Sequence, residues 1–321
     1  MALEYDIIIV GGGPAGLSAA SSIVRQDHTT VLFDSQKYRN ALSKHMHTLP
    51  TWDHQDPEAF RAAARANFER YGTVTIEKAE VRSAKRREEG NGQFEVVTDD
   101  GRTFVGKKMI LATGVEDIMP DIPGYADCWV SGIFHCLYCH GWEERGVSSA
   151  GVLAEGDIGK VPSALHIARQ ALRMAQHVNI YTDGNEALAR ELHDALQDGL
   201  PAPMTVDSRK IAKLVKAAER AKVTLEFEDG TTAVTEGFLA HKPKTRLRGD
   251  LAAQLGVEML PGNVVKVSPP FNQTSVRGVF AAGDCASPMQ TISAAIHSGM
   301  CTGGGAPSQL QADMYNQRGV F

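Results

Sequence analysis

Near its start the sequence reads Tyr5-Asp6-Ile7-Ile8-Ile9-Val10-Gly11-Gly12-Gly13-Pro14-Ala15-Gly16. The apolar run Tyr5–Val10, rich in β-branched side chains, predicts a short buried strand. Leu17–Val24 then predicts a helix, and Thr30–Phe33 predicts a second strand that Asp34 closes. The order strand, glycine turn, helix, strand is a β-α-β unit, and it indicates an α/β fold.

The glycines of this turn have the spacing of a dinucleotide-binding site, Gly11-x-Gly13-x-x-Gly16. Gly11 permits the tight turn, Gly13 lets a diphosphate approach the backbone, and Gly16 lets helix and strand pack closely. The diphosphate would rest on the helix N-terminus, where free N–H groups and the helix dipole favour an anion. Asp34 ends the second strand, where a carboxylate can accept the ribose hydroxyls. The turn therefore predicts a bound dinucleotide.

The same order of elements returns in the second half of the chain. Ser149–Leu153 predicts a strand, Pro162–Ala175 a helix and His177–Tyr181 the next strand. Each half also predicts a β-hairpin. The paired segments are Phe94–Thr98 with Arg102–Val105, and Val223–Phe227 with Thr231–Val234. We therefore expect two tandem Rossmann-like domains of the three-layer ββα type.

Two further buried strands are predicted at Lys108–Ala112 and Gly278–Ala282, with a helical tail from about Gln290 onward. Proline and glycine residues between Pro120 and Gly124 mark a crossover between domains. The first domain is expected to be discontinuous, made of residues 1–118 and 242–321. Residues 119–241 are expected to form the second domain, inserted between these two parts.

Composition and charge narrow the class of protein. A chain of 321 residues fits two domains of roughly 100–200 residues each. The net charge of −5 argues against nucleic acid as a partner, because phosphate binding needs a basic surface. No apolar stretch approaches the ~18 residues of a membrane span, and the acidic start MALEYD lacks the features of a signal peptide. We therefore expect a cytoplasmic protein with neither membrane nor nucleic acid as a partner.

The five cysteines include one close pair, Cys136 and Cys139. An odd count in a reducing compartment argues against a framework of structural disulfides. A CxxC pair can close a catalytic disulfide or share a metal, but a zinc site needs two further ligands at comparable spacing. Cys285 and Cys301 are not paired in this way, and the neighbouring histidines directly adjoin the thiols. We therefore favour a redox role and expect no metal.

Two patterns resemble those of the two-domain flavoprotein disulfide reductases. One is Ala112-Thr113-Gly114 at the end of a strand, and the other is Thr274-x-x-x-Gly278-Val279-Phe280-Ala281-Ala282-Gly283-Asp284. The resemblance implies that the dinucleotide is FAD, with Asp284 at the ribityl chain. The expected FAD-binding residues are Gly11, Gly13, Pro14, Ala15, Gly16, Asp34, Asn40, His45, Thr113, Gly114, Gly283, Asp284, Gln290 and Thr291.

Over nearly its whole length the chain resembles the low-molecular-weight thioredoxin reductase family. It is similar in particular to the fungal dithiol oxidases that close the disulfide bridge of gliotoxin-type epidithiodiketopiperazines. This closer match is carried by Tyr38-Arg39-Asn40-Ala41, His45-Met46-His47, Trp52-Asp53-His54, Gly132-Ile133-Phe134-His135-Cys136, Glu143-Glu144-Arg145-Gly146 and Tyr181-Thr182-Asp183-Gly184-Asn185-Glu186. The resemblance implies a homodimer in which Cys139 faces the flavin and Cys136 exchanges with a small-molecule dithiol.

Such chemistry needs a base, because free thiols titrate near pH ~8.5 and only the thiolate attacks. His140 adjoins Cys139 and is the candidate for this base, where classical thioredoxin reductases have an aspartate. Packing at a domain interface is the alternative role for this histidine. Glu143 or Glu144 would orient His140, with a position on the solvated surface as the alternative.

The second glycine turn bears on the direction of electron flow. It reads Ala154-Glu155-Gly156-Asp157-Ile158-Gly159, so alanine replaces the first glycine, and its two carboxylates would repel a diphosphate. The next strand ends at Tyr181-Thr182-Asp183-Gly184, without the arginines that reductases of the family carry for the 2′-phosphate of NADPH. We therefore expect weak NADPH binding and electron transfer from FAD to O₂, giving H₂O₂. The alternatives are an NADPH-dependent thioredoxin or disulfide reductase, and a non-catalytic flavoprotein that acts as a redox sensor or binding module. A third alternative is an oxidase that acts on a protein or on a dithiol that is not a diketopiperazine.

Overall fold

The computed structural model describes residues 3–88 and 92–321, and the chain divides into two compact units. Unit 1 consists of Met1–Glu116 and Thr245–Phe321, and unit 2 is Asp117–Lys244. The chain crosses between the units within β7 (Val115–Ile118) and β16 (Lys244–Leu247). In the described ranges no helix is long and apolar enough to cross a membrane.

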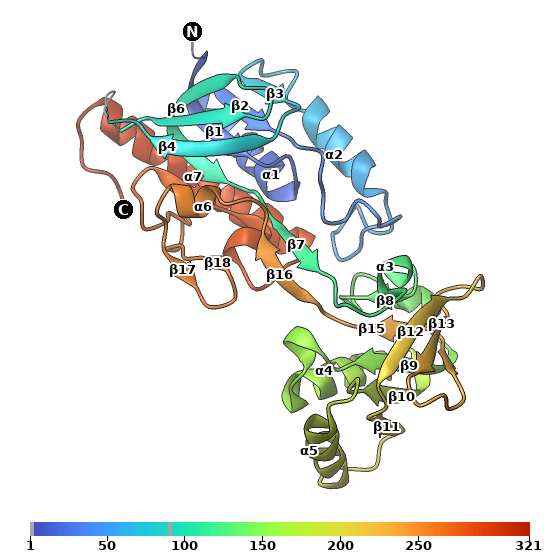
Figure 1. Cartoon of the computed structure of the whole chain (residues 1–321). Helices are drawn as coiled ribbons and strands as arrows, with labels where there is room; N and C mark the ends of the chain where they lie inside the picture. The colour runs from blue at the N-terminus through green and yellow to red at the C-terminus, as the bar shows by residue number, and fades with distance from the viewer. Residues whose placement is uncertain (1–2, 89–91) are drawn as a thin grey trace. The chain divides into compact units, whose positions relative to one another are not determined.

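Unit 1 is built on a sheet of strand order β3-β2-β1-β6-β5-β4, with β19 paired to β6 (Figure 1). Its strands are β1 (Leu3–Val10), β2 (Thr30–Phe33), β3 (Val74–Glu77), β4 (Val81–Arg86), β5 (Phe94–Thr98), β6 (Thr103–Leu111) and β19 (Val279–Ala281), with a small hairpin of β17 (Met259–Leu260) and β18 (Val264–Val265). Its helices are α1 (Pro14–Ile23), η1 (Val24–Gln26), α2 (Pro57–Ala66), α6 (Leu251–Gln254), η4 (Gly283–Ala286) and α7 (Ile292–Met314).

Strand β6 is continuous where the sequence predicted two strands, Arg102–Val105 and Lys108–Ala112. Its first half pairs antiparallel to β5, and its second half pairs parallel to β19. Strand β1 runs beside both halves and pairs with residues on either side of the expected break. The prediction of a break was wrong because this pairing satisfies the intervening backbone groups, which would otherwise need a turn or water.

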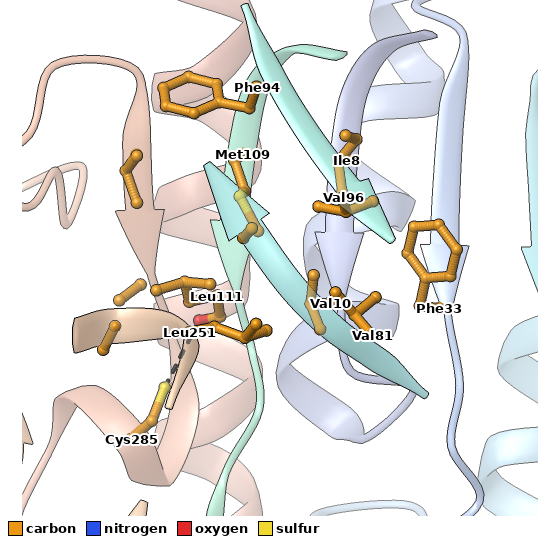
Figure 2. Close-up of a cluster of buried hydrophobic side chains, with 14 of the residues drawn as sticks. Ile8, Val10, Phe33, Val81, Phe94, Val96, Met109, Leu111, Leu251 and Cys285 are labelled. Carbon is orange, nitrogen blue, oxygen red and sulfur yellow. Dashed lines mark hydrogen bonds between the residues drawn. The ribbon is translucent and has the colours of Figure 1, made fainter. Parts of the chain in front are cut away.

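Alternate residues of β1 face two separate cores, which gives unit 1 three layers. Ile8 and Val10 pack with Phe94 and Val96 beneath the β4–β5 hairpin (Figure 2). The residues between them, such as Ile9, pack on the opposite face against α1 and α7, which lie side by side (Figure 1). The predicted three-layer ββα architecture is confirmed for this unit.

Unit 2 repeats the plan with a parallel sheet of order β11-β10-β9-β15-β8 and a meander β12-β13-β14. Its strands are β8 (Ile133–Phe134), β9 (Val147–Leu153), β10 (Ala175–Tyr181), β11 (Met204–Asp207), β12 (Ile211–Lys216), β13 (Val223–Phe227), β14 (Val234–Glu236) and β15 (Leu239–Ala240). Its helices are α3 (Tyr125–Cys128), η2 (Trp142–Glu144), η3 (Gly156–Ile158), α4 (Val161–Ala171) and α5 (Glu186–Gln197). Ala150 and Val152 of β9 face the core beneath α4, and Leu153 faces the core beneath the meander.

Several boundaries in unit 2 differ from the sequence prediction, and two of the differences have a clear physical cause. Helix α4 ends at Ala171 rather than Ala175, because Ala175 already pairs with Val147 as the first residue of β10. The second hairpin strand begins at Val234 rather than Thr231, because the Thr231 N–H and hydroxyl both bond the Asp229 carboxylate in a turn. In both places a pairing or side-chain bond overrides the local pattern.

Candidate functional site

The redox pair follows β8 at the carboxyl end of this edge strand of unit 2. Cys136 and Cys139 form a disulfide with their Cα atoms 5.2 Å apart. The N–H groups of Cys139 and His140 donate to the Cys136 carbonyl at 3.1 and 3.0 Å, which closes a tight turn. Leu137 inside this turn is buried in the core of unit 2, whereas both cysteines are only half-buried. The core therefore anchors the turn while the sulfurs stay near the surface.

The side chains around the cysteine pair differ in their contacts and in their exposure to solvent. The ring of His140 stacks on Phe134, with centroids 5.5 Å apart. Glu144 forms an ion pair with Arg220 at 3.0 Å, and Arg220 also donates to the Glu143 carbonyl at 2.6 Å. Glu144 is therefore already partnered by a cation, whereas Glu143 has an exposed side chain. The catalytic roles of His140 and Glu143 stay predictions.

The other three cysteines are free thiols. Cys128 and Cys285 are fully buried, and burial raises the pKa of each thiol. Cys285 also donates to the carbonyl of Ala282 at 3.2 Å. Cys301 is half-buried on α7, with its sulfur 3.7 Å from Nε2 of His297. Because a raised pKa suppresses the reactive thiolate, the two buried cysteines act as packing residues.

The glycine turn of unit 1 is held by contacts that admit no side chain. A Cβ on Gly11, whose φ is +125°, would lie 2.1 Å from the carbonyl oxygen of Ala112. A Cβ on Gly16 would lie 1.9 Å from the carbonyl oxygen of Gly11. Gly13 differs, because a Cβ there would meet no described atom within 4 Å. Helix α1 begins at the next residue, Pro14, so the open space at Gly13 lies directly at a helix N-terminus.

Asp34 follows β2 and is 4% exposed. Its carboxylate accepts the Gln36 N–H at 2.9 Å and the Tyr38 hydroxyl at 2.5 Å, and Arg65 approaches to 3.9 Å. Burial, then the hydrogen bond to Asp34 and the charge of that carboxylate, raise the pKa of Tyr38, so its hydroxyl stays a donor. A Cβ on Gly12 would lie 2.2 Å from Cγ of Asp34. The sequence motif treats this position as variable, yet the carboxylate requires glycine there.

Most of the other predicted cofactor residues gather at the same edge of the sheet. Thr113 follows β6, and Gly283 follows β19, just as Gly11 follows β1. These three strands are neighbours and parallel, and the carboxyl edge of such strands is where ligands bind. A Cβ on Gly283 would lie 2.9 Å from Cβ of Ala15 at the start of α1. Thr291 caps α7 by accepting the N–H of Ala294.

Two predicted residues have contacts that the sequence did not reveal. Asn40 accepts a hydrogen bond from Arg61 at 3.1 Å, and this arginine is 4% exposed. His45 lies in the loop between β2 and α2, where its exposed ring stacks on His54 with centroids 4.0 Å apart. The loop is anchored to α7 by the Ser293 hydroxyl, which donates to a loop carbonyl at 2.9 Å.

The comparison with known proteins agrees with this architecture. The family model for pyridine nucleotide-disulphide oxidoreductases matches residues 5–299. The chain belongs to this family. It is 47% identical over 318 residues to thioredoxin reductase tcpT of Claviceps purpurea, covering 98% of this chain and 97% of the relative. It is 44% identical to thioredoxin reductase aclD of Aspergillus oryzae, covering 96% and 97%. A solved oxidoreductase from Agrobacterium tumefaciens aligns with a TM-score of 0.84 at 30% identity, covering 98% and 100%.

Members of the pyridine nucleotide-disulphide oxidoreductase family typically bind FAD, and unit 1 has residues that fit this cofactor. The open space at Gly13 beside the start of α1 suits a diphosphate. The buried carboxylate of Asp34 would accept the adenosine ribose hydroxyls, and Asp284 would accept the ribityl hydroxyls. The resemblance to thioredoxin reductases and the expected thioredoxin reductase-like fold are both confirmed.

Unit 2 of this family member departs from unit 1 at the equivalent turn. The Gly11 N–H donates to the carbonyl that ends β2, and the Ala154 N–H donates to the carbonyl that ends β10, so the two residues correspond. Helix α1 begins at Pro14, but α4 begins only at Val161, after the short helix η3. The helix N-terminus that would hold a diphosphate is thus further along the chain in unit 2.

Two carboxylates near this second turn, Glu155 and Asp183, have surroundings that the sequence did not reveal. Burial raises the pKa of Glu155, and the charge of Asp183 raises it further. Asp183 itself forms an ion pair with Lys210 at 2.6 Å and accepts the Ile211 N–H at 2.8 Å. Its role at the start of β12 is structural. The displaced start of α4 is a further difference between this turn and the one in unit 1.

Proposed function

We propose that the protein is a FAD-dependent dithiol oxidase. It would close an intramolecular disulfide in a small-molecule dithiol of the epidithiodiketopiperazine type and deliver the electron pair to O₂, giving H₂O₂. The observation that carries this proposal is the second turn, because α4 starts too far along the chain to present its N-terminus as α1 does. A Cys136–Cys139 disulfide without a strong NADPH site suits oxidation of thiols by the enzyme.

The residues would divide the chemistry as follows. A substrate thiolate attacks the sulfur of Cys136, and the bond to Cys139 breaks, so that Cys139 leaves as a thiolate. The second substrate thiol, once deprotonated, attacks the first substrate sulfur and releases Cys136, which completes the product disulfide. The substrate has then lost two electrons and two protons, and the cysteine pair has gained the electrons. FAD, when bound, would take this electron pair from the cysteines and pass it to O₂.

His140 would hold the proton that a substrate thiol loses. The CxxC turn leads into the 3₁₀ helix η2, and the N–H groups of residues 139 and 140 are committed to the Cys136 carbonyl. These N–H groups therefore contribute little to stabilising a thiolate at the CxxC turn. A nearby base that accepts the thiol proton is correspondingly more important. The Phe134 stack would fix the plane of the imidazole.

A second candidate is an NADPH-dependent thioredoxin or disulfide reductase. It is favoured by the printed names of the fungal relatives, which are called thioredoxin reductases. In that case NADPH would reduce the flavin, and the cysteine pair would pass electrons to a disulfide. The two candidates predict opposite directions of electron flow through the same pair.

Oxygen uptake separates the two candidates. Purified FAD-loaded enzyme is mixed with dithiothreitol in an oxygen electrode without any nicotinamide. We expect catalytic uptake with one H₂O₂ formed for each O₂ consumed.

Cys136→Ser and Cys139→Ser should each lower the rate about a hundredfold or more, because either change removes the exchangeable disulfide. His140→Gln should lower kcat about a hundredfold and shift its pH profile.

Cys301→Ser is the matched control, because it removes a free thiol on α7 and leaves the CxxC pair intact. Its rate should equal that of the wild type. Fast NADPH oxidation coupled to thioredoxin reduction, without dithiol-driven oxygen uptake, would overturn the oxidase proposal.

We also propose that the protein is a homodimer. A molecular mass of one chain, measured by sedimentation equilibrium, would contradict this proposal.

A further inference from the structure

One partly buried arginine joins three segments of unit 1 that are far apart in sequence. Arg39, in the loop after β2, donates through Nη1 to Oδ2 of Asp284 at 3.0 Å and to Oε1 of Gln290 at 2.8 Å. Asp284 lies in η4, and Gln290 immediately precedes the N-cap of α7. The Arg39 side chain is 14% exposed, so these bonds are largely shielded from water.

The two residues that accept hydrogen bonds from Arg39 are both expected to contact FAD. Asp284 and Gln290 are both expected FAD contacts, and η4 begins at Gly283, which lies against Ala15 at the start of α1. A carboxylate and an amide of this kind can each rotate, and a wrong rotamer would turn their oxygens away from a ligand. Arginine suits the task of fixing them, because its planar guanidinium donates in several set directions and keeps its charge.

We propose that Arg39 is a positioning residue for FAD. It holds the Asp284 carboxylate and the Gln290 amide in the orientation that receives the cofactor, before the cofactor arrives. It also balances the charge of Asp284 close to the glycine turn, where that carboxylate would otherwise repel the diphosphate. Fixing both groups in advance lowers the entropic cost of binding, so Arg39 contributes to affinity through its two partners.

This inference rests on FAD being the cofactor, so the wild type is measured first. Apoprotein is titrated with FAD, and the quenching of flavin fluorescence gives the dissociation constant. We expect Arg39→Ala to raise this constant about tenfold or more, since two charge-assisted hydrogen bonds are lost. Arg39→Lys should recover part of the loss through a single bond. The FAD-induced rise in Tm should shrink in parallel, while the Tm of the apoprotein changes less.

A double-mutant cycle tests whether Arg39 acts through its partners. In an Asp284→Asn background the change Arg39→Ala should weaken FAD binding by a clearly smaller factor than it does in the wild type. Arg277→Ala is the matched control, because Arg277 also forms an ion pair with a carboxylate of unit 1, Asp313, at 2.6 Å. Its dissociation constant for FAD should equal that of the wild type.

The outcomes separate this inference from the proposed function. If the wild type fails to bind FAD, the proposed function fails and the inference fails with it. If the wild type binds FAD but Arg39→Ala binds equally well, or the cycle is fully additive, only the positioning role of Arg39 is overturned. Should Arg39→Ala fail to fold, Gln290→Ala removes one acceptor alone, and an unchanged dissociation constant in both Gln290→Ala and Arg39→Lys would overturn the role.

Discussion

At the residue scale, the protonation states of buried polar groups cannot be read from the pattern of charges in the sequence. His241 follows β15 and is 2% exposed, and its Nδ1 lies 2.6 Å from the Tyr125 hydroxyl. Burial lowers the pKa of His241 to about 4, and burial raises the pKa of Tyr125. Near neutral pH both groups are therefore uncharged, and their hydrogen bond joins two neutral partners. After burial, the charge of Asp117 and then that of Glu155 raise the pKa of Tyr125 further.

His241 should make unit 2 sensitive to acid. Between about pH 6.5 and pH 4 the unfolded chain protonates this histidine and the folded chain does not, so the free energy of unfolding falls as pH falls. A pKa lowered from 6.5 to about 4 corresponds to about 3 kcal/mol lost across that window. Urea unfolding of the wild type and of His241→Gln at several pH values measures the difference. Equal pH slopes for the two proteins would contradict the expectation.

At the element scale, α7 forms a helix although its glycine residues have low helix propensity. It contains Gly303-Gly304-Gly305, and each interior glycine costs about 1 kcal/mol relative to alanine. The structure explains two of the glycines on the face toward α1. A Cβ on Gly299 would lie 2.2 Å from the Ala15 carbonyl oxygen, and one on Gly303 would lie 2.6 Å from the Ala19 carbonyl oxygen. The close approach of the two helices thus requires the residues that weaken α7 in isolation.

Two glycine substitutions on α7 should therefore have opposite signs. Gly299→Ala places a methyl group against backbone that cannot move aside, and we expect about 1–3 kcal/mol of destabilisation. Gly304→Ala places it on the exposed side, 3.8 Å from the Phe271 ring, and we expect up to about 1 kcal/mol of stabilisation. The Tm of each purified variant tests this. The explanation fails if both variants move the Tm in the same direction.

At the scale of the whole molecule, each unit has its own cores. The two clusters that contain Ile8 and Ile9 draw only on unit 1, and the two that contain Val152 and Leu153 draw only on unit 2. Each unit also has a complete parallel sheet and a meander of its own. Such units meet a physical requirement for separate folding, because each core cluster is made of residues from one unit alone.

Residues 117–244 expressed alone should accordingly fold. We expect a cooperative urea transition followed by circular dichroism, and a Cys136–Cys139 disulfide that forms under mild oxidation. The same fragment carrying Leu192→Asp, which buries a charge in the core beneath α5, is the control that should not fold. A gradual, non-cooperative transition of the unmodified fragment would show that unit 2 depends on unit 1.

Much of this architecture was legible in the sequence. The strands Thr30–Phe33, Phe94–Thr98 and Val223–Phe227 have the predicted bounds, and the glycine turn of unit 1 lies between a strand and a helix as expected. These features depend on neighbours in sequence: the alternation of apolar residues, turn residues and glycine spacing. Such local preferences act before any distant contact forms, so a single chain displays them.

The tertiary structure alone decided the features that depend on distant partners. The unbroken β6 follows from pairing with β1, and the late start of α4 appears only when the two units are compared. The need for glycine at Gly12 comes from the Asp34 carboxylate, and the bonds of Arg39 reach residues more than two hundred positions away. Hydrogen bonds and steric limits of this kind act between atoms near in space, and sequence distance carries no information about them.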